Sequence, residues 1–175
     1  MKSKIARLTR RQATAGIAIV LGKLTIGGYA GAQQPATATT PSAANETRTS
    51  LHQEIELPAA PKRVFEILLD SKLFAAFTGM AAQIDPHPGG VFTTFGGLIE
   101  GRSVELITGQ RIVQAWRPTS WDPGVYSIVR FDLKARDAET RLVLDHTGFP
   151  QGDFDHLDPG WHERYWNPLI KYLAG

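Results

Sequence analysis

The sequence predicts an α+β domain in which helices cover one face of an antiparallel sheet. Two observations indicate this class: a series of strand-like segments between residues 84 and 148, and an aromatic-rich helical segment at the end of the chain. One strand-like segment and two short helical segments precede that series. The predicted order is therefore strand, two short helices, antiparallel meander and long terminal helix.

The first strand and the two short helices are predicted from a change of period. Residues 51–57 alternate apolar and polar side chains, which is typical of a strand with one buried face. After Pro61, apolar residues recur at helical spacing over 64–69 and again over 73–77. Gly79 then ends the second helix.

The meander is predicted from strand-like segments that are separated by turn residues. These segments are Ile84, 91–95, 98–107, 111–117, 125–135 and 141–148. The alternation is clearest from Val125 to Leu133, where apolar side chains share one face and charged side chains share the other. We expect one face of the sheet to meet the core and the other to meet water.

The last helix is predicted to begin with Asp158 as its N-cap and Pro159 at its first position. Large side chains then recur every four residues and form a stripe that would close the sheet, with Trp166 and Ile170 beside it: Trp161, Tyr165, Leu169 and Leu173. Pro168 lies inside this helix and is predicted to bend it.

Residues 1–32 have the pattern of a targeting segment. They hold six basic residues and no acidic one, followed by a mildly apolar stretch. Ala30-Gly31-Ala32 matches an A-x-A cleavage site, and Arg10-Arg11 resembles the twin-arginine export motif. We expect an exported protein, periplasmic or extracellular, cleaved after Ala32 and left without a stable membrane span. A general secretory signal is the alternative to the twin-arginine route.

Residues 33–48 are rich in Ala, Thr, Pro and Ser, and we predict a disordered linker there. The folded domain is then expected over residues 49–175. Removing the six basic residues of the leader from the chain's 19 leaves 13 against 17 acidic residues, a net charge of −4. The net charge of +2 for the whole chain therefore gives no argument for nucleic-acid binding. The absence of cysteine excludes disulfides and thiolate metal ligands.

A series of motifs resembles, in order, the C-terminal domain of activators of the Hsp90 ATPase. The motifs are Gly90–Gly97 with Gly101 and Glu105-Leu106, Arg111–Arg117 followed by Trp121 and Pro123-Gly124, Thr140, Leu142 and Leu144 with Gly148-Phe149-Pro150, and Gly160-Trp161 with Tyr165 and Trp166. The resemblance covers roughly residues 51–174. It implies the helix-grip fold of the SRPBCC (START, polyketide-cyclase and birch-pollen-allergen-like) superfamily, in which a curved sheet wraps around a long C-terminal helix.

The resemblance implies the fold more strongly than the activity. Eukaryotic activators carry a separate N-terminal domain that contacts the chaperone, whereas the segment before residue 49 is predicted to be a leader and a linker. Export would also separate the protein from a cytosolic chaperone. We therefore do not expect a chaperone partner, and a chaperone-activating interaction domain is the third functional hypothesis.

The main hypothesis is a non-catalytic binding protein for a small apolar or amphipathic molecule, held between the sheet and the terminal helix without a cofactor. Aromatic residues either pack a core or line such a cavity, and the sequence does not separate the two roles. The candidate lining residues are Phe92, Phe95, Trp116, Trp121, Val129, Phe131, His146, Trp161, Tyr165 and Leu169.

The alternative hypothesis is a cavity enzyme, cyclase-like or hydrolase-like, with a polar cluster around His146. Asp145 is adjacent in the strand and therefore points to the opposite face, so the two residues do not form a catalytic pair. We expect His146 to be a hydrogen-bonded inner histidine. No nucleophile or nucleotide motif occurs. The His, Asp and Glu residues over 153–163 match no metal-ligand spacing, so no metal site is expected.

Overall fold

The computed structural model describes residues 43–175. The predicted leader and residues 33–42 of the predicted linker lie outside the described residues. The elements in chain order are α1 (Ala43–Glu46), β1 (Ser50–Leu57), α2 (Pro61–Leu69), α3 (Ser71–Thr78), β2 (Gln83–Ile84), β3 (Val91–Thr94), η1 (Phe95–Gly97), β4 (Ile99–Ile107), β5 (Arg111–Pro118), β6 (Ser127–Arg136), β7 (Glu139–Thr147), α4 (Phe154–Trp161), η2 (His162–Trp166) and α5 (Asn167–Ala174).

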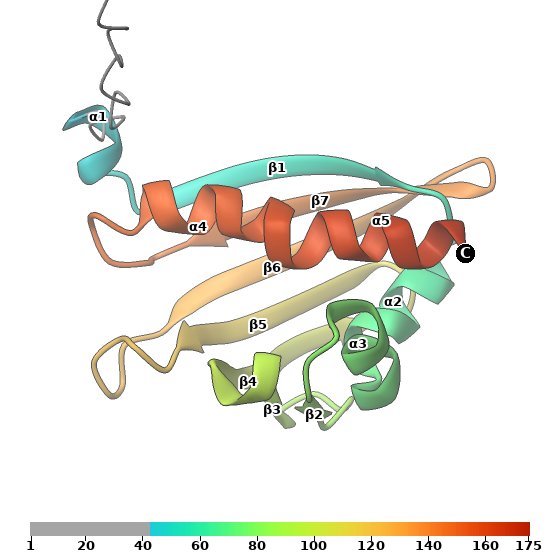
Figure 1. The fold of residues 1–175 in the computed structure, drawn as a ribbon, viewed down its shortest axis with the longest axis horizontal. Helices are drawn as coiled ribbons and strands as arrows, with labels where there is room; N and C mark the ends of the chain where they lie inside the picture. Colours follow the sequence, from blue (N-terminus) through green and yellow to red (C-terminus); the bar gives the residue numbers. More distant parts are fainter. Residues whose placement is uncertain (1–42) are drawn as a thin grey trace, which may run out of the picture. The chain divides into compact units, whose positions relative to one another are not determined.

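The seven strands form one antiparallel sheet in the order β1-β7-β6-β5-β4-β3-β2. From β7 to β2 each strand pairs with its neighbour in sequence, which is the predicted meander, and β1 joins the sheet beside β7. The pairing of β4 with β5 shifts between Ser103 and Glu105, and such a bulge bends a strand and increases its twist. Figure 1 shows the curved sheet, with the segment α4–η2–α5 lying across one face and α2 and α3 at one end. The predicted α+β helix-grip fold is confirmed.

The core lies between the sheet and the helices. Along β1 and β6, alternate side chains are buried and the others are exposed, as the sequence pattern predicts. Val129 and Phe131 of β6 face the terminal helix, whose Trp166 and Leu169 are fully buried. The rings of Trp161 and Trp166 stack, with centroids 5.5 Å apart. Each buried aromatic side chain removes roughly 150–250 Å² from water, so this layer dominates the stability of the fold.

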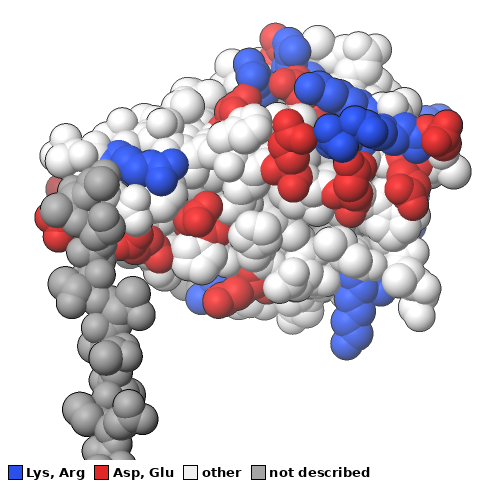
Figure 2. Space-filling view, turned by 90° about the horizontal axis from the view of Figure 1, so that it is seen from above, with Lys and Arg blue, Asp and Glu red and all other residues white. Residues whose placement is uncertain are grey.

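The other face of the sheet carries a continuous network of ion pairs, which we call the outer ladder. In order, its contacts are Glu105–Arg111 (3.5 Å), Arg111–Asp132 (2.6 Å), Asp132–Arg130 (3.1 Å), Arg130–Asp145 (2.5 Å), Asp145–His52 (2.7 Å), His52–Glu54 (3.7 Å), Glu54–Arg141 (3.4 Å) and Arg141–Glu56 (2.6 Å). Figure 2 shows basic and acidic side chains interleaved along one side of the molecule. The ladder crosses five strands. Because acidic and basic side chains alternate along it, no two like charges are neighbours in the ladder.

The terminal helical segment begins earlier than predicted. The helix α4 starts at Phe154 with Asp153 as its N-cap, and Pro159 lies inside it. Asp158 does not cap the helix: its carboxylate and its carbonyl accept hydrogen bonds from Gln53 of β1. The added turn buries Phe154 and Leu157, and their packing outweighs the hydrogen bond that Pro159 cannot donate.

The middle of the terminal segment is π-helical rather than α-helical. The N–H of Asn167 donates to the carbonyl of His162, which is the wider π-type spacing. Pro168 then occupies the first turn of α5, where its missing N–H has the lowest cost. The structure therefore has a π-helical turn immediately before Pro168, the residue at which the sequence predicts a bend. Ile170 is exposed, whereas Trp166, predicted to lie beside the stripe, is fully buried.

The observed strand ends differ from the predicted ones by a few residues. The largest structural difference is at Phe95, which the sequence pattern places at the end of a strand but which lies in η1 with φ 53°. A positive φ is unusual for a bulky residue. Before the predicted start of the domain, Asn45 of α1 donates to Asp155 of α4 over 2.8 Å. Ordered structure among the described residues therefore begins before residue 49.

Candidate functional site

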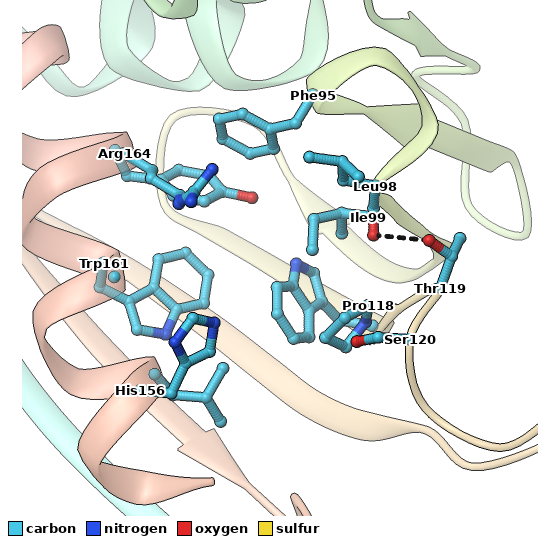
Figure 3. Close-up of a pocket in the computed structure, with 13 residues that line it drawn as sticks. Phe95, Leu98, Ile99, Pro118, Thr119, Ser120, His156, Trp161 and Arg164 are labelled. Carbon is cyan, nitrogen blue, oxygen red and sulfur yellow. Dashed lines mark hydrogen bonds between the residues drawn. The ribbon is translucent and has the colours of Figure 1, made fainter.

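A pocket opens between the sheet and the terminal helix, beside the ends of β4 and β5 (Figure 3). Three segments form its walls: the turn η1 with the start of β4, the end of β5 with the turn that follows, and one face of α4 and η2. Its lining residues are Phe95, Leu98, Ile99, Trp116, Pro118, Thr119, Ser120, His156, Leu157, Gly160, Trp161, Arg164 and Tyr165.

The pocket has a volume of about 210 Å³. Ligand pockets usually measure roughly 300–1,000 Å³, so this one suits a small molecule or one ring of a larger molecule. Most of its lining is aromatic or aliphatic, and its ionisable side chains other than Tyr165 are the basic Arg164 and His156, with no carboxylate. Leu98 is 50% exposed, so part of the apolar wall faces solvent.

Gly160 leaves the helical side of the pocket open. It lies in α4, where a β-carbon would meet no atom within 4 Å. Glycine inside a helix costs about 1 kcal/mol relative to alanine, and the surrounding packing does not require this glycine. A residue without a side chain at this point allows a ligand to approach the helix backbone.

The wall at Tyr165 contains buried polar atoms. Burial of the Tyr165 hydroxyl raises its pKa, and the side chains of Trp116 and Thr94, which lie within hydrogen-bonding range of it, partly oppose that rise. Among the described residues, neither Trp116 Nε1 nor Thr94 Oγ1 forms a hydrogen bond of acceptable geometry. Both residues are almost fully buried, and an unsatisfied buried donor costs about 1–3 kcal/mol. The indole nitrogen of Trp116 is therefore enclosed beside the Tyr165 hydroxyl and is not open to the pocket.

The inner histidine is a structural hydrogen-bonding group. Trp161 Nε1 can only donate, so His146 Nδ1 accepts this bond at 3.2 Å and His146 Nε2 carries the proton. His146 Nε2 then donates to Ser127 Oγ over 2.7 Å, and Ser127 donates to the carbonyl of Trp116 over 2.9 Å. Burial lowers the pKa of His146 to about 3. The ring is therefore neutral and enclosed, as expected for an inner histidine rather than for a general base.

The structure brings part of the predicted ligand-binding set together. Phe95, Trp116, Trp161 and Tyr165 line the pocket. Phe92 and Phe131 line a much smaller space of about 10 Å³ on the far side of Tyr165. The remaining candidates pack in or beside the core and line neither space: Trp121, Val129, His146 and Leu169. Trp121 packs edge-on against Trp116, with ring centroids 5.9 Å apart.

Sequence reasoning missed the polar and small residues of the pocket. Gly160 carried a usable signal, because a glycine within a helical pattern often has a packing or functional reason. Arg164 and His156 look like ordinary solvated residues in the sequence. Thr119 and Ser120 lie in a turn whose approach to the helix is set by tertiary structure.

Among residues 43–175, no group of three or more His, Asp or Glu side chains is placed to hold a metal ion. Within the same residues, no helix has the length and apolar character needed to cross a membrane.

The sheet order and the long terminal helical segment define a protein with a helix-grip α+β fold. A family model described as "Activator of Hsp90 ATPase homolog 1-like protein" matches residues 58–174, and the chain belongs to this family.

Similar proteins support this assignment. The chain is 27% identical over 116 residues to the human activator of 90 kDa heat shock protein ATPase homolog 1, covering 66% of this chain and 34% of the human protein. It is 29% identical over 124 residues to the Dictyostelium discoideum homolog, covering 70% and 32%. The chain thus spans about a third of the length of these relatives. A crystal structure of an HSP90 activator from Plasmodium falciparum matches with a TM-score of 0.69 and 24% identity, covering 73% of this chain and 97% of that chain.

Proposed function

We propose that this protein is an exported, non-catalytic binding protein for a small apolar or amphipathic molecule, which occupies the pocket between the sheet and the terminal helix. The observation that carries the proposal is the combination of an aromatic pocket with an open helical position at Gly160. Packing alone would favour a larger residue there, since alanine is the better helix former. Binding a ligand gives that open position a role.

The chemistry of the lining favours binding over catalysis. A general base needs a pKa near the working pH and access to the substrate. His146 has neither property, because its pKa is lowered to about 3 and it is not among the residues that line this pocket. His156 is exposed at the pocket, but its side chain has no orienting hydrogen bond among the described residues. Among the described residues, the lining of this pocket therefore offers no positioned acid–base pair for the cyclase-like or hydrolase-like alternative.

The matched pair Gly160→Ala and Gly160→Phe tests the proposal. Thermal stability is measured with a library of lipids, quinones and aromatic metabolites. The native protein and Gly160→Ala are expected to be stabilised by the same ligands, because a bound ligand raises stability by mass action. Gly160→Phe places a ring in the pocket and should lose that response while remaining folded. Equal responses in Gly160→Phe would show that the ligands bind elsewhere, and no response in any protein would reject the proposal.

Chaperone activation is a second candidate function, because the chain belongs to a family that is described by this activity. We nevertheless propose that this chain does not stimulate an Hsp90 ATPase, for the following reasons. An activator must bind the chaperone states with different affinity, usually through an interface of about 1,200–2,000 Å². The segment Trp121-Asp122-Pro123-Gly124 resembles the family but closes a turn, in which the carbonyl of Trp121 accepts from Arg117.

An ATPase assay with the chaperone of the same organism decides between these functions. It compares the full chain with the chain from Gln33 onward, so that the predicted leader is also tested. We expect no saturable stimulation. Stimulation that disappears in a folded Trp121→Ala variant would establish the activator function and reject the proposal of a chaperone-independent protein.

Export is part of the proposal and rests on the sequence of residues 1–32. Replacement of Arg10 and Arg11 by lysine is expected to block transport by the twin-arginine route. The measurement is the amount of processed protein outside the cytoplasm. Unchanged export of the variant would favour a general secretory signal, and a native protein that stays unprocessed in the cytoplasm would contradict export.

A further inference from the structure

We infer that Tyr165 limits the length of the ligand, so that the pocket takes a compact, ring-sized molecule and excludes an extended acyl or alkyl chain. This inference rests on the proposed function and names the class of ligand that the pocket accepts. It follows from the position of Tyr165 between two spaces inside the molecule.

Tyr165 separates the pocket from a second space within the core, which we call the inner space. The inner space has a volume of about 10 Å³, which leaves room for about one water molecule. Phe74 and Thr94 are two of the residues that line it. Of the described residues that line the pocket or the inner space, Tyr165 alone lines both. Its side chain is therefore the wall that the two spaces share.

Aromatic contacts on both sides hold the Tyr165 ring in place. The ring centroid lies 5.0 Å from that of Phe95 and 4.4 Å from that of Trp161, two residues of the pocket wall that are labelled in Figure 3. On the side of the inner space it lies 5.8 Å from the ring centroid of Phe74. Tyr165 is only 7% exposed. A ring enclosed on both sides in a densely packed interior loses these contacts if it moves aside, so it acts as a fixed wall.

The hydroxyl group of Tyr165 is held from both spaces as well. Trp116 of the pocket wall and Thr94 of the inner space lie within hydrogen-bonding range of it. Displacement of the side chain would take the buried hydroxyl away from these neighbours, which adds a polar cost to the loss of packing.

The fixed wall determines what happens to a long chain. A chain that enters the pocket cannot continue into the inner space while Tyr165 stays in place, so its remaining methylene groups must leave through the mouth. A buried methylene raises affinity by about fourfold, whereas one that stays in water adds little. A long chain therefore gains no affinity over a compact molecule that fills the pocket.

A series of 4-alkylphenols, from 4-methylphenol to 4-hexylphenol, tests the inference on the full chain. Dissociation constants come from titrations followed by the tryptophan indole N–H signals in nitrogen-15 NMR spectra. In the native protein, affinity should rise by about fourfold per methylene up to the propyl member and by less than about 1.5-fold per methylene beyond it. This break is expected because a pocket of about 210 Å³ suits one ring with a short substituent.

The matched variants are Tyr165→Leu and Phe74→Leu. Both shorten a buried aromatic side chain that lines the inner space, but Phe74 does not line the pocket. Tyr165→Leu joins the two spaces, so its affinity should continue to rise by about fourfold per methylene through the pentyl member. Phe74→Leu should keep the break of the native protein. Tyr165→Phe should keep it too, because the ring remains.

The possible failures can be told apart. The inference would be overturned, with pocket binding intact, by a constant gain per methylene up to 4-hexylphenol in the native protein. A break in Tyr165→Leu at the native position, or the same extension in Phe74→Leu as in Tyr165→Leu, would also overturn it. No change of any indole signal with any member would show that the pocket does not admit a ring-sized molecule, and would overturn the proposed function as well.

A second measurement on the native protein decides the matter if Tyr165→Leu does not fold. The terminal methyl group of bound 4-propylphenol should show a nuclear Overhauser effect to the ring protons of Tyr165, because the chain ends against that wall. A bound ligand whose methyl group shows no such effect would overturn the inference.

Discussion

The two faces of the sheet shift the pKa of histidine in opposite directions. His146 on β7 faces the core, where burial lowers its pKa to about 3. His52 on β1 faces solvent, where its hydrogen bond to Asp145 raises its pKa against the opposing effect of burial, and Glu54 adds to the rise. The two histidines lie close together, since Leu51 is the register partner of His146 and His52 that of Asp145.

The difference shows that the face on which a side chain lies determines its environment and its protonation. A shift of one residue along a strand moves a side chain from one face to the other. Asp145 follows this rule: burial favours a higher pKa for its carboxyl, but hydrogen bonds from His52 and Arg130 outweigh burial and lower the pKa. The inner face therefore provides neutral hydrogen bonding in an apolar layer, and the outer face provides ion pairs exposed to salt and water.

The largest expected effect is on the inner layer, at Trp161. Trp161→Ala removes a ring that is 2% exposed and contacts Trp116, Phe131 and Trp166. The expected loss is about 3–5 kcal/mol, a large part of a total stability of about 5–15 kcal/mol. Chemical denaturation measures it. A midpoint close to that of the native protein would show that the stripe does not close the sheet.

The next effect concerns pH and His146. Because the folded pKa lies below the unfolded value, the unfolded state takes up the proton first as the pH falls. The stabilisation due to neutral His146 is complete above the unfolded value of 6.5 and is lost progressively as pH falls toward 3. Between pH 7.5 and pH 4.5 the loss is about 2–3 kcal/mol.

The comparison variant for this prediction is His146→Gln, which keeps a donor and an acceptor but does not titrate. Unfolding free energies of both proteins are measured by urea denaturation at the two pH values. The stability difference between them should shrink by the stated amount at the lower pH. A difference that is independent of pH would mean that His146 is protonated or hydrated in the folded state.

A smaller effect of opposite sign is expected at Gly160. Gly160→Ala should stabilise the protein by about 0.5–1 kcal/mol, because it improves helix propensity and its methyl group enters open space. Thermal unfolding without ligand measures it. Destabilisation would mean that the helix packs more closely there than the open pocket indicates.

The smallest effect is expected on the outer face, at His52. Its raised pKa means that its pairing with Asp145 stabilises the protein below the unfolded pKa and is lost as pH rises through the folded pKa. His52→Gln should therefore cost less than about 1 kcal/mol, with the larger cost at pH 5.5 and little at pH 8. Urea denaturation at both values, with and without added salt, measures it. A cost that increases with pH would contradict the assigned pairing.

The sequence predicts the faces of the sheet better than the walls of the pocket. Alternation from Val125 to Leu133 assigns the inner side chains of β6 correctly, because one buried face fixes the period of the pattern. The start of α4 is missed because Pro159 suggests a first helical position, while Phe154 and Leu157 add a buried turn before it.

The pocket depends on segments that are distant in sequence. Phe95 and Ser120 come from turns, and their approach to Gly160 and Arg164 is a result of sheet curvature and of the π-helical turn. No local pattern encodes that approach. The candidate aromatic residues therefore divide between pocket and core in a way that residue type alone could not predict.

The claim that the pocket between the sheet and the terminal helix holds a ligand is tested most directly by native mass spectrometry of the protein purified from its source. We expect a population heavier by the mass of one small organic molecule, which is absent from Gly160→Phe and retained in Gly160→Ala. Fragmentation of the released molecule then identifies it. A single ligand-free mass for the native protein, or the same additional mass in Gly160→Phe, would contradict the claim.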